Sequence, residues 1–242
     1  MKQKRGYRRG YPVALLAGLE DHQAVLWTVF SNVVKPEKTL CLEGTRNDPK
    51  AVYNFHESII NALRPSLKEG IRSIIVVSPM RTHHAQRFID HIRRHHLWLS
   101  QGPNKAIFSE ATGSAGTLSE VASMTTTPVF HRLINETTSE ETESLIDILE
   151  KHLHASNQEM SVLYSLEETG DLLFGPWKPG RPKPEYLMLT DKYLSDSCEK
   201  NRIHRLMQLA KNRNVKTRIV GAESTVGLRL TQLGGMVCLC AS

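Results

Sequence analysis

The chain has 242 residues, of which 40% are apolar and 23% are charged, enough to build the core of one large or two small domains. No apolar run reaches the roughly 18 to 20 residues that a membrane-spanning helix needs, and the basic N-terminus lacks the apolar stretch of a secretory signal. The four cysteines have no spacing typical of a zinc site or a disulfide scaffold, so a reduced, cytoplasmic protein is expected.

Positive charge is concentrated in two segments, and the net charge of +6 favours polyanionic partners. Five of the first nine residues are basic, and a second group, accompanied by five histidines, lies between residues 81 and 96. We expect both groups to bind RNA through its phosphates. The residues concerned are Lys2, Lys4, Arg5, Arg8, Arg9, Arg81, Arg87, Arg93 and Arg94.

The first half of the sequence predicts three antiparallel strands followed by alternating helices and strands. Short apolar runs at residues 12–17, 24–30 and 39–42 are separated by polar turns, which is typical of hairpins. Asp48 and Pro49 predict the start of a helix, and the β-branched run at 71–77 predicts a strand buried on both faces. Helices at 82–97 and 139–153, a strand at 105–109 and a short helix capped by Thr117 complete a ribonuclease-H-like α/β pattern.

A second α/β unit is predicted after the polar segment 155–158. Helices are expected at 166–174, 198–211 and 223–233, and strands at 186–189, 216–220 and 236–240, the last with Cys238 and Cys240 as buried thiols. This alternation predicts a small three-layer α/β/α sandwich. The predicted divisions are a basic arm (1–10), a first domain (11–156) and a second domain (157–242).

Several segments, in the same order along the chain, resemble the Pelota and archaeal–eukaryotic class-1 release factor family. Residues 74–79 (IIVVSP), a basic helix and residues 110–121 (EATGSAGTLSEV) are similar to the central domain of that family. Residues 164–174 and 218–237 are similar to its C-terminal domain. The resemblance implies a ribonuclease-H-like central domain followed by a C-terminal domain of the ribosomal-protein-like type.

Two features of the sequence depart from that family. Only about ten mostly basic residues precede the first predicted strand, so no counterpart of the family's N-terminal domain is expected. The segment 43–48 (EGTRND) stands where release factors carry the Gly-Gly-Gln tripeptide, whose glutamine backbone positions the hydrolytic water. Pelota also lacks the tripeptide, so we assign no catalytic residue and no cofactor.

The resemblance implies a non-catalytic, ribosome- or RNA-associated translation factor, a Pelota-like paralogue in ribosome rescue or recycling. Its partners would be ribosomal or transfer RNA and either a translational GTPase or the ribosome-recycling ATPase. Two alternatives stay open: a peptidyl-tRNA hydrolase or RNA nuclease with a non-standard loop, and a free RNA-binding module.

Three other candidate sites have ordinary structural explanations. His84, His91 and His95 have helical spacing that suits metal chelation, but a third ligand and an acidic partner are not evident, so no metal site is expected. The glycines at 113 and 116 favour a tight turn over a phosphate cradle. Four carboxylates considered for two-metal nuclease chemistry lack an acid on the first strand to join them. They are Asp21, Asp48, Glu110 and Glu120.

The segment 175–184 holds four prolines and two glycines and predicts a loop. Its aromatic and basic residues fit a contact with a partner or RNA, because an exposed tryptophan can stack and cations can meet phosphates. The candidate residues are Trp177, Lys178, Arg181 and Lys183.

Overall fold

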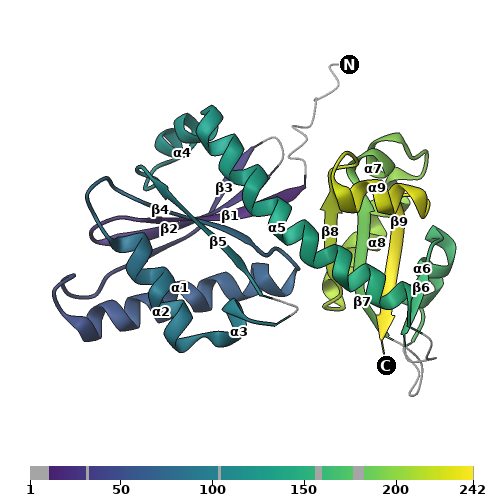
Figure 1. Cartoon of the computed structure of the whole chain (residues 1–242), viewed down its shortest axis with the longest axis horizontal. Helices are drawn as coiled ribbons and strands as arrows, with labels where there is room; N and C mark the ends of the chain where they lie inside the picture. The colour runs from purple at the N-terminus through teal and green to yellow at the C-terminus, as the bar shows by residue number, and fades with distance from the viewer. Residues whose placement is uncertain (1–10, 31–32, 103–104, 156–159, 177–182, 242) are drawn as a thin grey trace, which may run out of the picture. The chain divides into compact units, whose positions relative to one another are not determined.

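The computed structural model describes residues 11–30, 33–102, 105–155, 160–176 and 183–241 (Figure 1). Contacts between Cα atoms divide the chain into two units. Unit 1 comprises residues 1–64 and 71–138, and unit 2 comprises residues 65–70 and 139–242. Each unit has its own mixed β-sheet, so the α/β class that the sequence predicts is confirmed.

The sheet of unit 1 has five strands in the order β3-β2-β1-β4-β5. Antiparallel pairing joins β1 to β2 and β2 to β3, whereas parallel pairing joins β1 to β4 and β4 to β5. The strands are β1 (Pro12–Leu19), β2 (Gln23–Phe30), β3 (Val34–Cys41), β4 (Ser73–Ser78) and β5 (Ile107–Thr112).

Helices cover both faces of this sheet, which explains why every residue of β4 is buried. Figure 1 shows α1 and α2 on one face and α4 with the beginning of α5 on the other. On the latter face, Ile75 and Val77 pack with Val121 and Phe130. The helices of this part of the chain are α1 (Pro49–Lys68), α2 (His84–His95), α3 (Leu97–Ser100), α4 (Leu118–Thr125) and α5 (Pro128–Leu153).

The sheet of unit 2 has four strands in the order β6-β9-β7-β8. Only the pairing of β7 with β8 is parallel. The strands are β6 (Met160–Leu163), β7 (Lys183–Thr190), β8 (Lys216–Val220) and β9 (Met236–Ala241), and the helices are α6 (Leu166–Phe174), α7 (Asp191–Asp196), α8 (Lys200–Asn212) and α9 (Thr225–Gln232).

Alternate residues of β7 enter separate cores on the two faces of this second sheet. Leu187 and Leu189 pack with residues of α6 and α8, whereas Tyr186 and Met188 pack with α9 and the last part of α5. Cys238 and Cys240 lie buried in β9 as free thiols, as predicted.

Several elements differ from the sequence prediction. Strand β3 begins at Val34, and it was hard to recognise because an exposed edge strand has no alternating apolar pattern. Helix α5 begins at Pro128, not at residue 139, and Thr127 accepts a hydrogen bond from the Phe130 amide at its start. Strand β6 and helices α3 and α7 were not predicted because each is short.

The division between the two units falls within α5, between residues 138 and 139, and the last residues of α1, from 65 onward, also belong to unit 2. The predicted change of domain at 156–157 lies outside the described residues. Among the described helices, none combines the length and the apolar character that crossing a membrane would demand.

Candidate nucleic-acid interface and histidine cluster

Helix α2 has one buried face and one exposed basic face. Its apolar side chains, among them Phe88 and Ile92, are buried, whereas Arg87, Arg93 and Arg94 are exposed. A helix with this pattern packs one stripe on the core and leaves the rest to solvent. The structure therefore places three of the predicted RNA-binding arginines on the solvent side of a single rigid element.

The three arginines are not equivalent. Arg87 and Arg94 are seven residues apart and so lie on the same side of the helix, whereas Arg93 is turned by about 100° from Arg94. The Arg93 guanidinium lies 3.6 Å from the carboxylate of Asp90. This pair is exposed and therefore weak, so it competes only modestly with a phosphate. Arg81 lies just before α2, exposed and with a positive φ of 66°.

Most of the other predicted contact residues lie outside the described residues. They are Lys2, Lys4, Arg5, Arg8 and Arg9 of the basic arm and Trp177, Lys178 and Arg181 of the proline-rich segment. Lys183 is described, and it opens strand β7 instead of belonging to a loop. Its backbone pairs with Ala241 of β9, and the residue is exposed.

The segment 43–48 forms a short turn held against the β1–β2 connection. The Arg46 side chain donates hydrogen bonds to the backbone carbonyls of Asp21 and Glu20, the first at 3.0 Å. Within the turn, the Asp48 amide donates to the Thr45 carbonyl at 3.1 Å. A turn fixed in this way cannot reach far from the domain.

The loop at residues 113–116, which precedes α4, is fixed by hydrogen bonds to other parts of unit 1 and by the cap of the following helix. The Trp27 indole donates to the Ala115 carbonyl at 2.9 Å, and the Ala115 amide donates to the Glu20 carboxylate at 3.0 Å. Gly18 lies against this loop, and only a glycine fits at that position, because a Cβ there would lie 2.6 Å from the Ala115 carbonyl oxygen. Thr117 and Glu120 form a complete capping box at the start of α4.

These bonds favour the tight-turn interpretation of the loop over a phosphate site. A phosphate would need free backbone N–H groups, and those of Ala115, Thr117 and Glu120 already donate to protein oxygens. The loop lines a pocket of about 880 Å³ at the end of β5. The charged residues of that pocket are Glu110, Glu120, Glu136 and Arg132, an excess of negative charge that disfavours an anion.

The four carboxylates considered for nuclease chemistry are engaged separately. Asp21 lies 2.9 Å from the His84 imidazole, and Asp48 accepts the Lys50 amide at the start of α1. Glu120 belongs to the capping box and lines the same pocket as Glu110, but neither Asp21 nor Asp48 lines that pocket. Since no three of the four gather closely enough to hold a metal ion, the structure gives no support to a two-metal nuclease site built from them.

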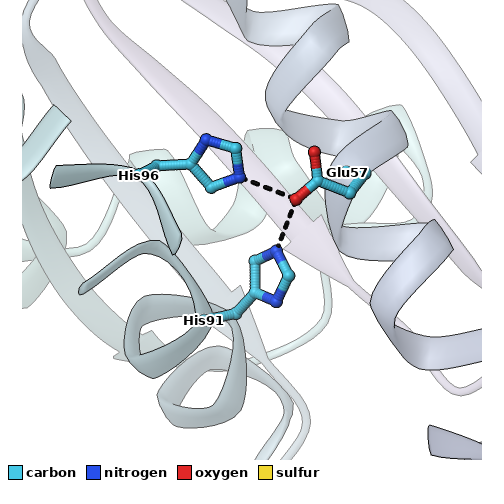
Figure 2. A group of neighbouring side chains, drawn as sticks. All are labelled: Glu57, His91 and His96. Carbon is cyan, nitrogen blue, oxygen red and sulfur yellow. Dashed lines mark hydrogen bonds and ion pairs between the residues drawn. The ribbon is translucent and has the colours of Figure 1, made fainter. Parts of the chain in front are cut away.

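A different set of side chains converges between α1 and the C-terminal end of α2. The Nε2 atoms of His91 and His96 lie 2.9 and 2.7 Å from the same carboxylate oxygen of Glu57 (Figure 2). Figure 2 shows both imidazole rings pointing at that carboxylate. Within the described ranges, this is the one place where three potential metal ligands gather, with their donor atoms all within 4.8 Å of one another.

The histidines at and next to α2 differ in their exposure to solvent. His84, His91 and His96 are each only 8% exposed, whereas His95 is exposed. The spacing of seven and four residues that suggested a common face does not describe the cluster, because His84 pairs with Asp21 instead. Sequence spacing could not have found Glu57, which belongs to another helix, or His96, which lies just beyond the end of α2.

Burial and hydrogen bonding set the charge of the cluster. Burial would raise the pKa of the Glu57 carboxyl, but the hydrogen bonds from His96 and His91 outweigh it and lower that pKa. Burial lowers the pKa of His91, although Glu57 partly opposes this effect. Burial, together with His91 and Arg46, lowers the pKa of the neighbouring His56 to about 3. His56 is therefore neutral at physiological pH.

Comparison with known proteins gives structural matches only. No family model matches the chain, and no curated protein matches its sequence. A structure of ribosome-bound archaeal Pelota and ABCE1 matches with 15% identity and a TM-score of 0.53, covering 99% of this chain and 64% of that chain. The chain has a Pelota-like fold.

Two further structures are similar at lower scores. Dom34 of S. cerevisiae, a translation termination-like factor that interacts with Hbs1, has 19% identity and a TM-score of 0.48, covering 94% of this chain and 62% of that chain. The archaeal termination factor aRF1 has 12% identity and a TM-score of 0.34, covering 94% and 60%. In all three comparisons the chain spans less than two thirds of the matched protein.

Proposed function

We propose that this chain is a non-catalytic, ribosome- or RNA-associated translation factor, a cytoplasmic Pelota-like paralogue that acts in ribosome rescue or recycling. The observation that carries the proposal is the Pelota-like fold, which extends over 99% of the chain and so includes both units in order. The archaeal Pelota of that comparison is ribosome-bound, and we propose the ribosome as a partner of the present chain as well.

The finer domain assignment belongs to this proposal. A basic arm (1–10) would precede a ribonuclease-H-like central domain (11–156) and a C-terminal domain of the ribosomal-protein-like type (157–242). The strand order β3-β2-β1-β4-β5, with antiparallel pairing followed by parallel pairing, supports the first of these names. Helices packed on both faces of a four-stranded sheet support a three-layer second domain.

The exposed arginines of α2 supply the RNA-binding surface in this proposal. Cations fixed along one helix suit contact with several phosphates, and no base-reading geometry is needed for it. The second domain would bind a translational GTPase or the ribosome-recycling ATPase, with the proline-rich segment and Lys183 near that contact. The short turn at 43–48, tied to the β1–β2 connection through Arg46, supports the absence of peptide release.

Cosedimentation with ribosomal subunits tests the proposal. The wild-type chain is expected to pellet with subunits at low salt and to remain in the supernatant at high salt. Arg87→Ala with Arg94→Ala should reduce pelleting. The matched control is Arg202→Ala with Lys211→Ala, which removes the same charge from exposed side chains of α8 and should leave pelleting unchanged. The proposal would be contradicted if the wild type and the α2 variant pelleted equally. It would also be contradicted if neither the wild type nor either variant pelleted with subunits.

A further inference from the structure

Glu57, His91 and His96 present one carboxylate oxygen and two imidazole nitrogens to a common point. Two histidines and one carboxylate form a donor set that binds Zn²⁺ while leaving a fourth position open. The imidazoles are nearly enclosed, since the His91 and His96 side chains are 7% and 10% exposed, whereas Glu57 is 29% exposed. The carboxylate therefore marks the side of the cluster that solvent can reach.

We propose that Glu57, His91 and His96 form a zinc site, in which the ion links α1 to the C-terminal end of α2. The ion would take one oxygen from Glu57 and one nitrogen from each histidine, and water would complete a four-coordinate geometry from the solvent side. This departs from the expectation of no metal, which rested on the lack of an evident third ligand and acidic partner for His84, His91 and His95.

The distances suit an ion after the three donor atoms shift relative to one another. Zinc bonds of about 2.0 to 2.2 Å in tetrahedral geometry place neighbouring donor atoms roughly 3.4 Å apart. The two nitrogens now lie 2.7 and 2.9 Å from the Glu57 oxygen, so they must withdraw from it by about 0.7 and 0.5 Å. All three donor atoms lie within 4.8 Å of one another, so the two nitrogens must approach each other by up to about 1.4 Å. His96 can make this adjustment readily, because its backbone (φ −129°, ψ 58°) lies at the junction of α2 and α3, outside either helix.

Binding also requires a change of tautomer in the imidazoles. A histidine that donates from Nε2 to Glu57 carries its proton there, and a ligating Nε2 must present its lone pair. Moving the proton to Nδ1 keeps each ring neutral, and the Glu57 carboxylate supplies negative charge to the ion. Zinc thus replaces two hydrogen bonds to a single oxygen with bonds to three donors.

A zinc ion at this site would fix the end of α2 relative to α1. The bonded donors come from α1, from α2 and from the residue just after α2, so the ion would join the end of α2 to its neighbour. Metal binding of this kind stabilises the folded state, because the unfolded chain does not hold the three donors together. The inference concerns zinc binding by the free chain and does not depend on ribosome binding.

Competition between the full chain and a chromophoric zinc chelator tests the site, using protein prepared without an affinity tag that contains histidine. The wild type is expected to bind about one Zn²⁺ per chain and to gain thermal stability from it. Glu57→Gln, His91→Ala and His96→Ala should each weaken binding by at least about 100-fold, since losing an outer partner of a ligand already costs 10- to 100-fold. Each of these variants should also lose the zinc-dependent rise in Tm.

Two control variants distinguish the cluster from surface histidines. His83→Ala removes an exposed histidine at the start of α2, and His154→Ala removes the histidine of an exposed pair with Glu150 in unit 2. Both should bind zinc like the wild type. If a cluster alanine variant fails to fold, Glu57→Gln, which keeps the side-chain shape, decides the result. Less than half an equivalent bound by the wild type, or equal weakening by His83→Ala or His154→Ala, would overturn the proposal.

Discussion

Arg218 of β8 and Glu141 of α5 form an ion pair inside unit 2, with the guanidinium Nη2 atom 2.5 Å from the carboxylate Oε1 atom. Their side chains are 6% and 3% exposed, so both charges have left water. A buried charge is tolerated only when a partner compensates for the lost hydration. The pair therefore makes each of these residues depend on the other.

Removal of one partner should destabilise the chain strongly. We expect Glu141→Ala to lower the free energy of unfolding by about 3 to 5 kcal/mol, because the Arg218 guanidinium would stay buried without its counter-charge. The measurement is urea unfolding followed by circular dichroism. Glu199→Ala is the matched control, since it removes the partner of Arg202 from an exposed ion pair and should cost no more than about 1 kcal/mol. Equal losses for the two variants would contradict the prediction.

A second ion pair predicts a pH-dependent contribution to stability. The Arg229 guanidinium lies 2.8 Å from the Glu150 carboxylate, and its hydrogen bond lowers the pKa of Glu150 below the ordinary value of 4.5. A carboxyl with a lowered pKa in the folded state stabilises that state above the unfolded pKa. This contribution disappears as the pH falls through the lower, folded pKa.

Comparison of the wild type with Glu150→Gln should reveal this dependence. The wild type should exceed the variant in unfolding free energy above pH 4.5, and the difference should shrink as the pH falls below that value. The measurement is urea unfolding at several pH values. The same comparison in an Arg229→Gln background should show a weaker dependence on pH. A difference that grew on acidification would have the wrong sign.

The sequence predicted most elements of the fold because their cores leave periodic patterns. The β4 strand is a continuous apolar run buried on both faces, and the α2 helix has Phe88 and Ile92 at helical spacing. Strand β3 was predicted only in part, since Pro36 and its exposed neighbours at the edge of the sheet carry no apolar pattern. The start of α5 at Thr127 and Pro128 did have a recognisable signal, a capping threonine followed by proline.

The candidate site was less accessible to sequence reasoning. Arg87, Arg93 and Arg94 could be placed on the solvent side of α2, because the apolar residues of the same helix define its buried side. The histidine cluster could not be predicted, since it depends on the packing of α1 against α2. Glu57 and His91 are 34 residues apart in sequence, and no local period connects them.

Binding to RNA should depend on salt and only weakly on sequence. Removal of one phosphate contact flattens the slope of log affinity against log salt by about 0.7 to 0.9. We expect Arg94→Ala to have close to this effect and Arg93→Ala a smaller one, because the Arg93 guanidinium already faces Asp90. The measurement is fluorescence anisotropy with two unrelated RNAs. Lys211→Ala in unit 2 is the control, and affinity that does not change with salt would refute the prediction.

The last prediction concerns peptide release. Hydrolysis of peptidyl-tRNA by this fold would require a segment that reaches the ester and positions water there. The turn at 43–48 contains one glycine and no glutamine, and Arg46 ties it to the backbone of Asp21 and Glu20. Stalled ribosome–nascent-chain complexes incubated with the chain should therefore release peptide no faster than complexes without it. Replacement of residues 43–48 by a Gly-Ser linker of equal length should leave this result unchanged. Rapid release by the wild type that disappears in the linker variant would show that the turn is catalytic and that the non-catalytic assignment is wrong.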